Sequence, residues 1–217
     1  VALVMTSMVV LAGSVVRMTG SGMGCPDWPK CFGLLIPPTS ADEVTWTEGE
    51  SYDAGRMLIA NDTLWVAQTE IVAEDFERER SAGNWEAYTK HSYATFNSLH
   101  TWVEFINRLI GALTGIPALL LIALSFFGGW RYRLWNPFRW SVVHLFFLGL
   151  VAWMGKKVVD GNLIPFSITL HMVGAVFILM ALALILYSVR QGHWKESLGV
   201  QRKLWLVLAA LLTLGQL

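Results

Sequence analysis

Three ionisable side chains occupy positions that a membrane-spanning protein tolerates poorly. Glu104 and Arg108 stand at the start of one long apolar run, and His171 lies inside another. Ionisable groups at membrane depth are costly, and they usually mark a ligand, ion or electron pathway. Proton exchange by the carboxylate and ligand binding by the imidazole are the chemistries that these residue types permit.

The composition is typical of a protein that crosses a membrane several times. Of 217 residues, 54% are hydrophobic, and the formal net charge is zero. Five apolar segments cover residues 1–16, 109–130, 140–155, 163–189 and 204–217. The third is short, because a span needs about 20 residues, unless it continues through Val158 and Val159. No cleavable signal peptide is visible, and both ends lie inside apolar stretches, so we expect part of a longer protein.

Charge is segregated along the chain. Of the 16 acidic residues, 13 lie between Arg17 and His100. The connections after the second and fourth apolar segments are basic: Arg131, Arg133, Arg139, Arg190, Lys195, Arg202 and Lys203. Short basic loops stay on the cytoplasmic side, so residues 18–100 are expected to form an acidic external loop. The apolar spacing within it predicts a surface helix over Thr63–Arg80.

Helical rise gives the expected depth of the candidate residues. Counting back from the basic boundary places Glu104 about 7 Å above the hydrocarbon edge and His171 about 3 Å below it. Glu104, Asn107 and Gly111 share one helical face by their spacing. The two helices would bracket a site in the outer leaflet, with the acid and the imidazole about 10 Å apart in height.

The remaining cysteines and histidines give weaker signals. Cys25 and Cys31 are the only cysteines, and on an oxidising external side they are expected to form a disulfide. Two thiols alone make a poor zinc site. His144 is interpreted as a hydrogen-bonded packing residue of the opposite leaflet. His193 is a loop residue with no case for function, and His91 lies in the external stretch.

Three motifs contain the candidate residues. GSVVRMTGSGMGCPDWPKC over residues 13–31 is similar to the first-helix exit and cysteine loop of the haem A synthase family. WVEFINR over residues 102–108 resembles its Glu-x-x-His-Arg motif. KVVDGNLIP over residues 157–165, followed by Thr169-Leu-His171-Met, resembles the connection that leads to a haem-ligand histidine.

The resemblance implies an all-α integral membrane protein of eight helices in two pseudo-symmetric halves. Residues 1–189 would be the amino-terminal four-helix bundle, with a long external loop containing short helices. Residues 190–217 would begin the fifth helix of a missing second half. The implied activity is oxidation of a methyl group of haem O to a formyl group, which gives haem A for cytochrome oxidase. The substrate haem would lie in this half and a haem b cofactor in the missing one, so we expect no activity from this chain alone.

By motif, Glu104 would be the catalytic carboxylate and His171 a haem-iron ligand. Where the family motif has a second histidine, this chain has Asn107, and an amide is a poor haem ligand. His100 is a weak substitute, about 16 Å above His171 by helical rise. We therefore favour one protein ligand and an open opposite face. Arg17 and Arg108 are candidates to bind haem propionates, with snorkelling to headgroups as the alternative.

Other readings remain open at this stage. Glu104 could merely pair with Arg108, four residues on, in a non-enzymatic membrane cytochrome or haem-handling protein. A small-solute transporter should show paired Gly/Pro interruptions, and only Pro117 hints at one. The expected setting is the bacterial inner membrane. The expected partners are lipid, haem O synthase, cytochrome oxidase assembly factors and a second copy of the chain, with no nucleic acid.

Overall fold

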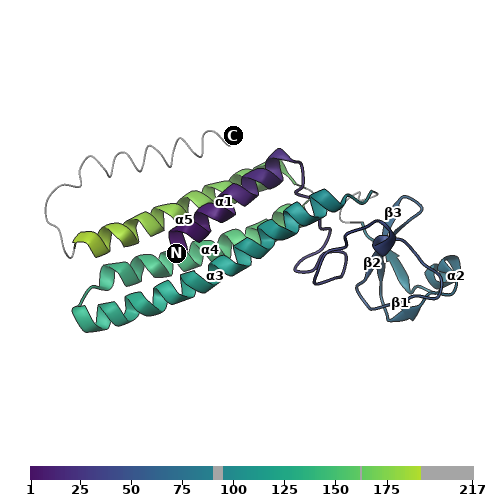
Figure 1. Cartoon of the computed structure of the whole chain (residues 1–217), viewed down its shortest axis with the longest axis horizontal. Coiled ribbons are helices and arrows are strands. Elements are labelled where there is room, and N and C mark those ends of the chain that lie inside the picture. The colour runs from purple at the N-terminus through teal and green to yellow at the C-terminus, as the bar shows by residue number, and fades with distance from the viewer. Residues whose placement is uncertain (90–94, 162, 192–217) are drawn as a thin grey trace. The chain divides into compact units, whose positions relative to one another are not determined.

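The computed structural model describes residues 1–89, 95–161 and 163–191. The chain divides into two compact units (Figure 1). Unit 1 comprises Val1–Ser14, Arg108–Gly155 and the chain from Pro165 onward, and unit 2 comprises Val15–Asn107 and Lys156–Ile164. Unit 1 is built from long helices. Unit 2 contains the short strands and also the helix ends that lead into them.

Four apolar segments of the sequence are confirmed as helices. They are α1 (Ala2–Met18), α3 (Ser98–Tyr132), α4 (Trp135–Asp160) and α5 (Pro165–Gln191). Of these, α3, α4 and α5 are each long and apolar enough to cross a membrane, whereas α1 has 17 residues. The third segment does continue through Val158 and Val159. The predicted segment 204–217 lies outside the described residues, and a bundle of four spanning helices stays a prediction.

Local chemistry explains where these helices bend and end. Arg133 adopts a positive φ of 60° directly after α3, so the chain reverses into α4 within two residues. Pro165 is the first residue of α5, where its missing N–H costs no helical hydrogen bond. Pro117 lies inside α3, and membrane helices accept such a proline because neighbouring groups satisfy the freed backbone.

Close packing joins α3 to α4 and α4 to α5 within unit 1. The hydroxyls of Ser125 and Ser141 share a 2.7 Å hydrogen bond between α3 and α4. Between α4 and α5, the rings of Phe147 and Phe177 stack with centroids 5.0 Å apart. A Cβ at Gly174 would lie 2.4 Å from a methyl of Val151. Gly174 is therefore needed for this approach, as small residues commonly are between membrane helices.

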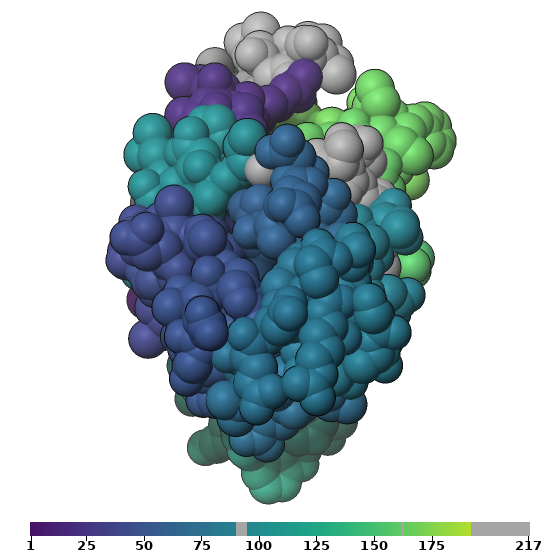
Figure 2. All heavy atoms as spheres, turned by 90° about the vertical axis from the view of Figure 1, so that its right-hand side faces the viewer, coloured from purple at the N-terminus to yellow at the C-terminus, as the bar shows by residue number. Residues whose placement is uncertain are grey.

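Unit 2 contains two small antiparallel sheets (Figure 1). One pairs β1 (Ser51–Tyr52) with β4 (Ile71–Val72), and the other has the order β2 (Met57–Ala60), β3 (Thr63–Ala67), β5 (Trp85–Ala87). The 3-10 helix η1 (Asp42–Val44) and the helix α2 (Phe76–Ser81) complete the unit. Figure 2 shows one face of it, where the blue residues of the strand region form the surface.

The surface helix predicted over Thr63–Arg80 is wrong, because the first part of that range contains the strands β3 and β4. Only its last part, within α2, is helical. The hairpin before β3 explains the difference: Asn61 and Asp62 both have positive φ, 51° and 55°, and join Ala60 to its partner Thr63. Two-residue turns of this kind match the twist of paired strands. The described part of residues 18–100 thus holds short helices, as expected, together with strands that were not expected.

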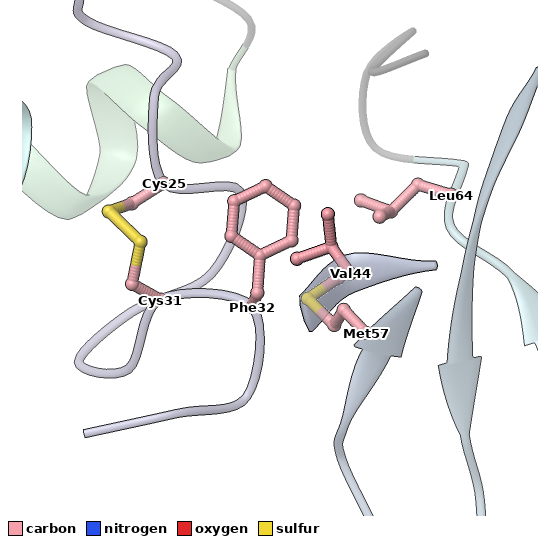
Figure 3. Packing of buried hydrophobic residues seen from close by; sticks show 6 residues of the cluster. All are labelled: Cys25, Cys31, Phe32, Val44, Met57 and Leu64. Carbon is pink, nitrogen blue, oxygen red and sulfur yellow. A yellow bond between two sulfur atoms is a disulfide. The ribbon is translucent and has the colours of Figure 1, made fainter. Parts of the chain in front are cut away.

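Two hydrophobic clusters form the core of unit 2. The first gathers around Phe32 (Figure 3) and contains Cys25, Cys31, Phe32, Val44, Met57 and Leu64. The second contains Tyr52, Leu58, Ala67, Ile71, Ala73 and Trp85, with Trp46, Trp65 and Phe76 packed against it.

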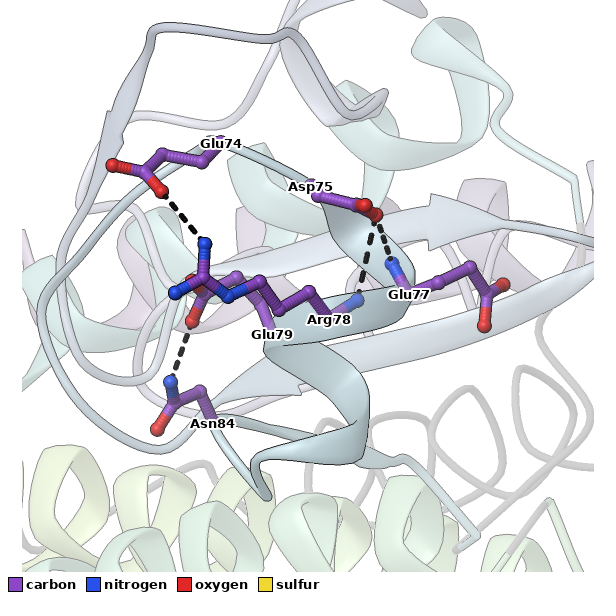
Figure 4. Close-up of polar contacts among 6 residues, drawn as sticks. All are labelled: Glu74, Asp75, Glu77, Arg78, Glu79 and Asn84. Atoms are coloured by element: carbon purple, nitrogen blue, oxygen red, sulfur yellow. Dashed lines mark hydrogen bonds and ion pairs between the residues drawn. The ribbon is translucent and has the colours of Figure 1, made fainter.

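At the start of α2 the Asp75 carboxylate accepts the N–H groups of Glu77 and Arg78 (Figure 4). Such a cap stabilises a short helix by about 1 kcal/mol.

Unit 2 is expected to lose stability in alkaline solution through Tyr52. Burial raises the pKa of Tyr52 above its usual value of about 10, and the Glu50 carboxylate adds to the rise. The pKa of Tyr52 is higher in the folded state than in the unfolded state. The contribution of the buried neutral phenol to the free energy of unfolding is therefore complete below pH about 10 and is lost as the pH rises through the folded-state pKa. Absorbance of tyrosinate and fluorescence of Trp46 and Trp85 should change together in that range. Tyr52→Phe should shift the fluorescence transition to higher pH, and an unshifted transition would contradict the assignment.

Candidate functional site

Glu104 is held by the disulfide loop. Its side chain lies on α3 and is only 3% exposed. One carboxylate oxygen, Oε2, accepts the backbone N–H of Cys25 at 2.7 Å. One turn earlier, the Thr101 hydroxyl donates to the carbonyl of Gly24 at 2.9 Å. Two successive loop residues are thus fixed against successive turns of the helix, and the carboxylate has a defined position.

The expected disulfide between Cys25 and Cys31 is present and buried. Asp27 lies within the loop that this disulfide closes. Its carboxylate accepts the N–H groups of Phe32 at 2.7 Å and Gly33 at 2.9 Å. Asp27 therefore fixes the loop by hydrogen bonds. The cysteine loop is a rigid element, and its first cysteine contacts the candidate catalytic acid.

Gly24→Ala is expected to displace the loop from α3. A Cβ at this position would lie 2.2 Å from the carbonyl oxygen of His100, and backbone cannot yield as a flexible side chain can. Overpacking of this kind typically costs about 1–3 kcal/mol, and thermal unfolding of the purified protein should show it. Gly22→Ala is the matched control, since its Cβ would meet only side-chain methyls, those of Leu163 and Val16, at 3.3 Å or more. Equal effects of the two changes would contradict the close approach.

Asn107 lies one turn beyond Glu104 on α3. Its Oδ1 atom is buried, and within residues 1–89, 95–161 and 163–191 no hydrogen-bond donor satisfies it. His100 lies in the first turn of the same helix, where its backbone N–H is bound by Asn97. Arg108 is half-buried on α3, and Arg17 is exposed in the last turn of α1. Binding of propionates by either arginine stays a prediction.

His171 lies on α5 directly opposite Gly155 of α4. A Cβ on Gly155 would lie 3.3 Å from the Cε1 atom of the imidazole, so glycine there leaves room for the ring. The Nδ1 atom of His171 is buried and has no hydrogen-bond partner in the described part of the chain. A buried polar atom without a partner is costly. A ligand that completes the site is one explanation for such an atom.

His144 differs from its expected role in one respect. It is fully buried, as a packing residue should be, but neither ring nitrogen makes a hydrogen bond with the described residues. His91 and His193 lie outside the described residues. Across the described ranges no group of three or more His, Cys, Asp or Glu side chains could hold a metal ion. A bare metal centre is therefore not indicated there.

The residues present are chemically suited to a haem. Haem iron takes imidazole as an axial ligand, and His171 offers a buried ring with an unsatisfied nitrogen. Glu104 belongs to unit 2 and His171 to unit 1. The common slot that the sequence predicts between them stays a prediction.

Three long apolar helices and a buried carboxylate on one of them define an integral membrane protein with a mostly helical fold. Residues 1–54 and 60–217 match the COX15-CtaA family model, described as cytochrome oxidase assembly protein. The chain belongs to that family.

Over 190 residues the chain is 26% identical to the heme A synthase of Shewanella oneidensis. The alignment covers 86% of this chain and 43% of that protein, so the chain spans less than half the length of this relative. No solved structure matches the chain. The resemblance to haem A synthases that the three motifs indicate is confirmed by these matches.

One part of the site escaped the sequence analysis. The Cys25 amide is a backbone donor, and no side-chain pattern announces its bond to Glu104. Two residues carried an indirect signal: Gly24 stands directly before the cysteine, and Thr101 stands one turn before the acid. A glycine permits close backbone approach, and a threonine at that spacing lies on the same helical face as Glu104.

Proposed function

We propose that this chain is the substrate-binding portion of a haem A synthase, which oxidises a methyl group of haem O to a formyl group. The match to the Shewanella oneidensis heme A synthase over 86% of the chain carries the proposal. Family membership and the three motifs support it. The protein would act in a bacterial inner membrane with unit 2 outside, and a haem b would bind in a further half beyond this chain.

The chemistry explains why such an enzyme needs a buried acid. Conversion of a methyl to a formyl group removes two hydrogens from the carbon and adds one oxygen, so C–H bonds must be broken and protons carried away. Glu104 is the residue proposed to accept protons from the reacting carbon or water, since a carboxylate can act as a general base. The hydrogen bond from the Cys25 N–H to Oε2 gives this carboxylate a defined position. His171 is proposed to hold the iron of the substrate on one face.

A second function has one observation in its favour. Glu104 contributes to structure by binding the disulfide loop, as expected of a non-enzymatic haem-binding membrane protein in which this acid is merely structural. The two functions differ in what happens to haem O. An enzyme converts it to haem A, whereas a haem-handling protein returns it unchanged.

Haem extraction tests the proposal. The full-length protein would be produced in cells that make haem O but lack another haem A synthase. Pyridine-haemochrome spectra and chromatography of the extracted haems should then show haem A. Recovery of haem O alone, from cells in which the protein is present and haem-loaded, would favour the haem-handling function. Residues 1–217 produced alone should give no haem A.

A further inference from the structure

Two apolar side chains of unit 2 project into solvent beside the disulfide loop. Leu35 is 79% exposed and Ile36 is 69% exposed. Buried residues lie close by on both sides: Phe32, three positions before Leu35, is in the first core cluster, and Pro37 and Pro38 directly follow Ile36. The chain therefore leaves the core for this pair and returns to it immediately afterwards.

Hydrogen bonds hold the pair in this exposed position. Before it, Cys31 and Leu34 exchange two backbone hydrogen bonds of 2.9 and 3.1 Å. After it, the carbonyl of Pro38 accepts the indole N–H of Trp102 at 3.2 Å. A loop fixed at both ends cannot fold its apolar tip back onto the core. The exposure of Leu35 and Ile36 is thus a property of the fold.

The same loop is attached to the ends of two apolar helices. Trp102 lies in the early part of α3. The ring of Trp28, a half-exposed loop residue, lies 5.9 Å from the ammonium of Lys156 near the end of α4. Tryptophan and lysine are enriched where membrane helices meet the lipid headgroups. Both attachments are therefore at the level expected for the surface of the bilayer.

We infer that Leu35 and Ile36 insert into the lipid bilayer at its surface beside these helix ends. The partner is a phospholipid surface: the two aliphatic side chains enter the edge of the hydrocarbon, while Trp28 and Lys156 lie among the headgroups. Apolar surface that the fold leaves uncovered in water would be covered by lipid. The insertion anchors the loop whose Cys25 amide holds Glu104. It does not depend on the proposed enzymatic activity.

Spin labelling of the full-length protein in lipid vesicles tests the inference. The chain's two cysteines form the disulfide, so Leu35→Cys and Ile36→Cys would each add a single reactive thiol to the described chain. Val72→Cys is the control, because Val72 is 60% exposed in the same unit on β4. Oxygen concentrates in lipid and a nickel chelate stays in water. The ratio of oxygen to nickel collisions should be several-fold higher at positions 35 and 36 than at position 72.

Two results of the spin-label experiment would overturn the inference. A collision ratio at positions 35 and 36 equal to that at position 72 would place the tip in water. Low collision rates with both reagents would show that protein covers it. Wild-type protein in nanodiscs containing a photoactivatable phospholipid gives an answer without substitution. Lipid adducts should form on the peptide containing Leu35 and Ile36 and not on the peptide containing Val72, and the reverse would also refute insertion.

Discussion

Glu104→Gln should lower haem A formation by at least about 100-fold, the lower end of what a general acid–base residue contributes, while leaving the disulfide loop in place. Glutamine keeps a side-chain oxygen that can accept the Cys25 N–H, which Glu104 binds at 2.7 Å. It cannot exchange protons at neutral pH. The substitution therefore separates the proposed proton transfer from the observed structural contact. The measurement is the ratio of haem A to haem O in extracts from cells with equal amounts of each protein.

The matched variant is Glu104→Ala, which removes both roles. It leaves the Cys25 N–H without its carboxylate partner, and an unsatisfied buried donor costs about 1–3 kcal/mol. Thermal unfolding should therefore show Glu104→Ala clearly less stable than Glu104→Gln, although both should be inactive. Activity retained by Glu104→Gln and lost only in Glu104→Ala would show that the residue is structural. That outcome would refute its role in catalysis.

The membrane helices could be predicted because the bilayer imposes a single requirement on them. Backbone groups in hydrocarbon must be satisfied internally, so an apolar run of sufficient length is enough to predict a helix. Their ends were harder to predict. The start of α3 at Ser98 lies well before the apolar run at Leu109, because its first turns belong to unit 2, where Phe105 packs against the first core cluster. Trp102 and Phe105 occupy those turns.

The strands of unit 2 could not be predicted from apolar spacing, since they are only two to five residues long. Over such lengths helical and strand periods are not distinguished. The turn at Asn61 and Asp62 was the better signal, because it determines the pairing of β2 with β3. Turn residues with positive φ thus outweighed a helical pattern of Leu64, Val66 and Ile71.

The sequence identifies as candidates those residues whose polar side chains are energetically costly within an apolar helix. Glu104 and His171 stand out because a charged or polar group is expensive in an apolar helix. Their surroundings include a backbone amide for the first and a facing glycine for the second. A backbone amide and a glycine have no side-chain chemistry that would reveal these contacts in the sequence. Both contacts are identified only from the positions of α4 and the cysteine loop in the structure. Residue chemistry identifies candidates, whereas the fold identifies what holds them.

His171→Leu should remove the haem from the substrate site. Leucine fills a similar volume and eliminates a buried nitrogen that has no hydrogen-bond partner among the described residues, so the fold should be retained or slightly stabilised. The loss of the axial imidazole should lower haem affinity by at least about tenfold. A tenfold change corresponds to a loss of only about 1.4 kcal/mol of binding free energy. Haem O titrated into the purified full-length protein, followed by its visible absorbance, measures the affinity.

His144→Leu is the matched control, because His144 is also a buried histidine of unit 1 whose ring nitrogens lack partners in the described ranges. It should bind haem O as the unsubstituted protein does. Equal losses in the two variants would mean that both histidines act through packing and that neither is specifically the ligand.

The visible spectrum of the haem-loaded wild-type protein tests the number of imidazole ligands separately. With Asn107 in place of a second histidine, iron bound through one imidazole should not show a bis-imidazole spectrum, and such a spectrum would refute the single-ligand assignment.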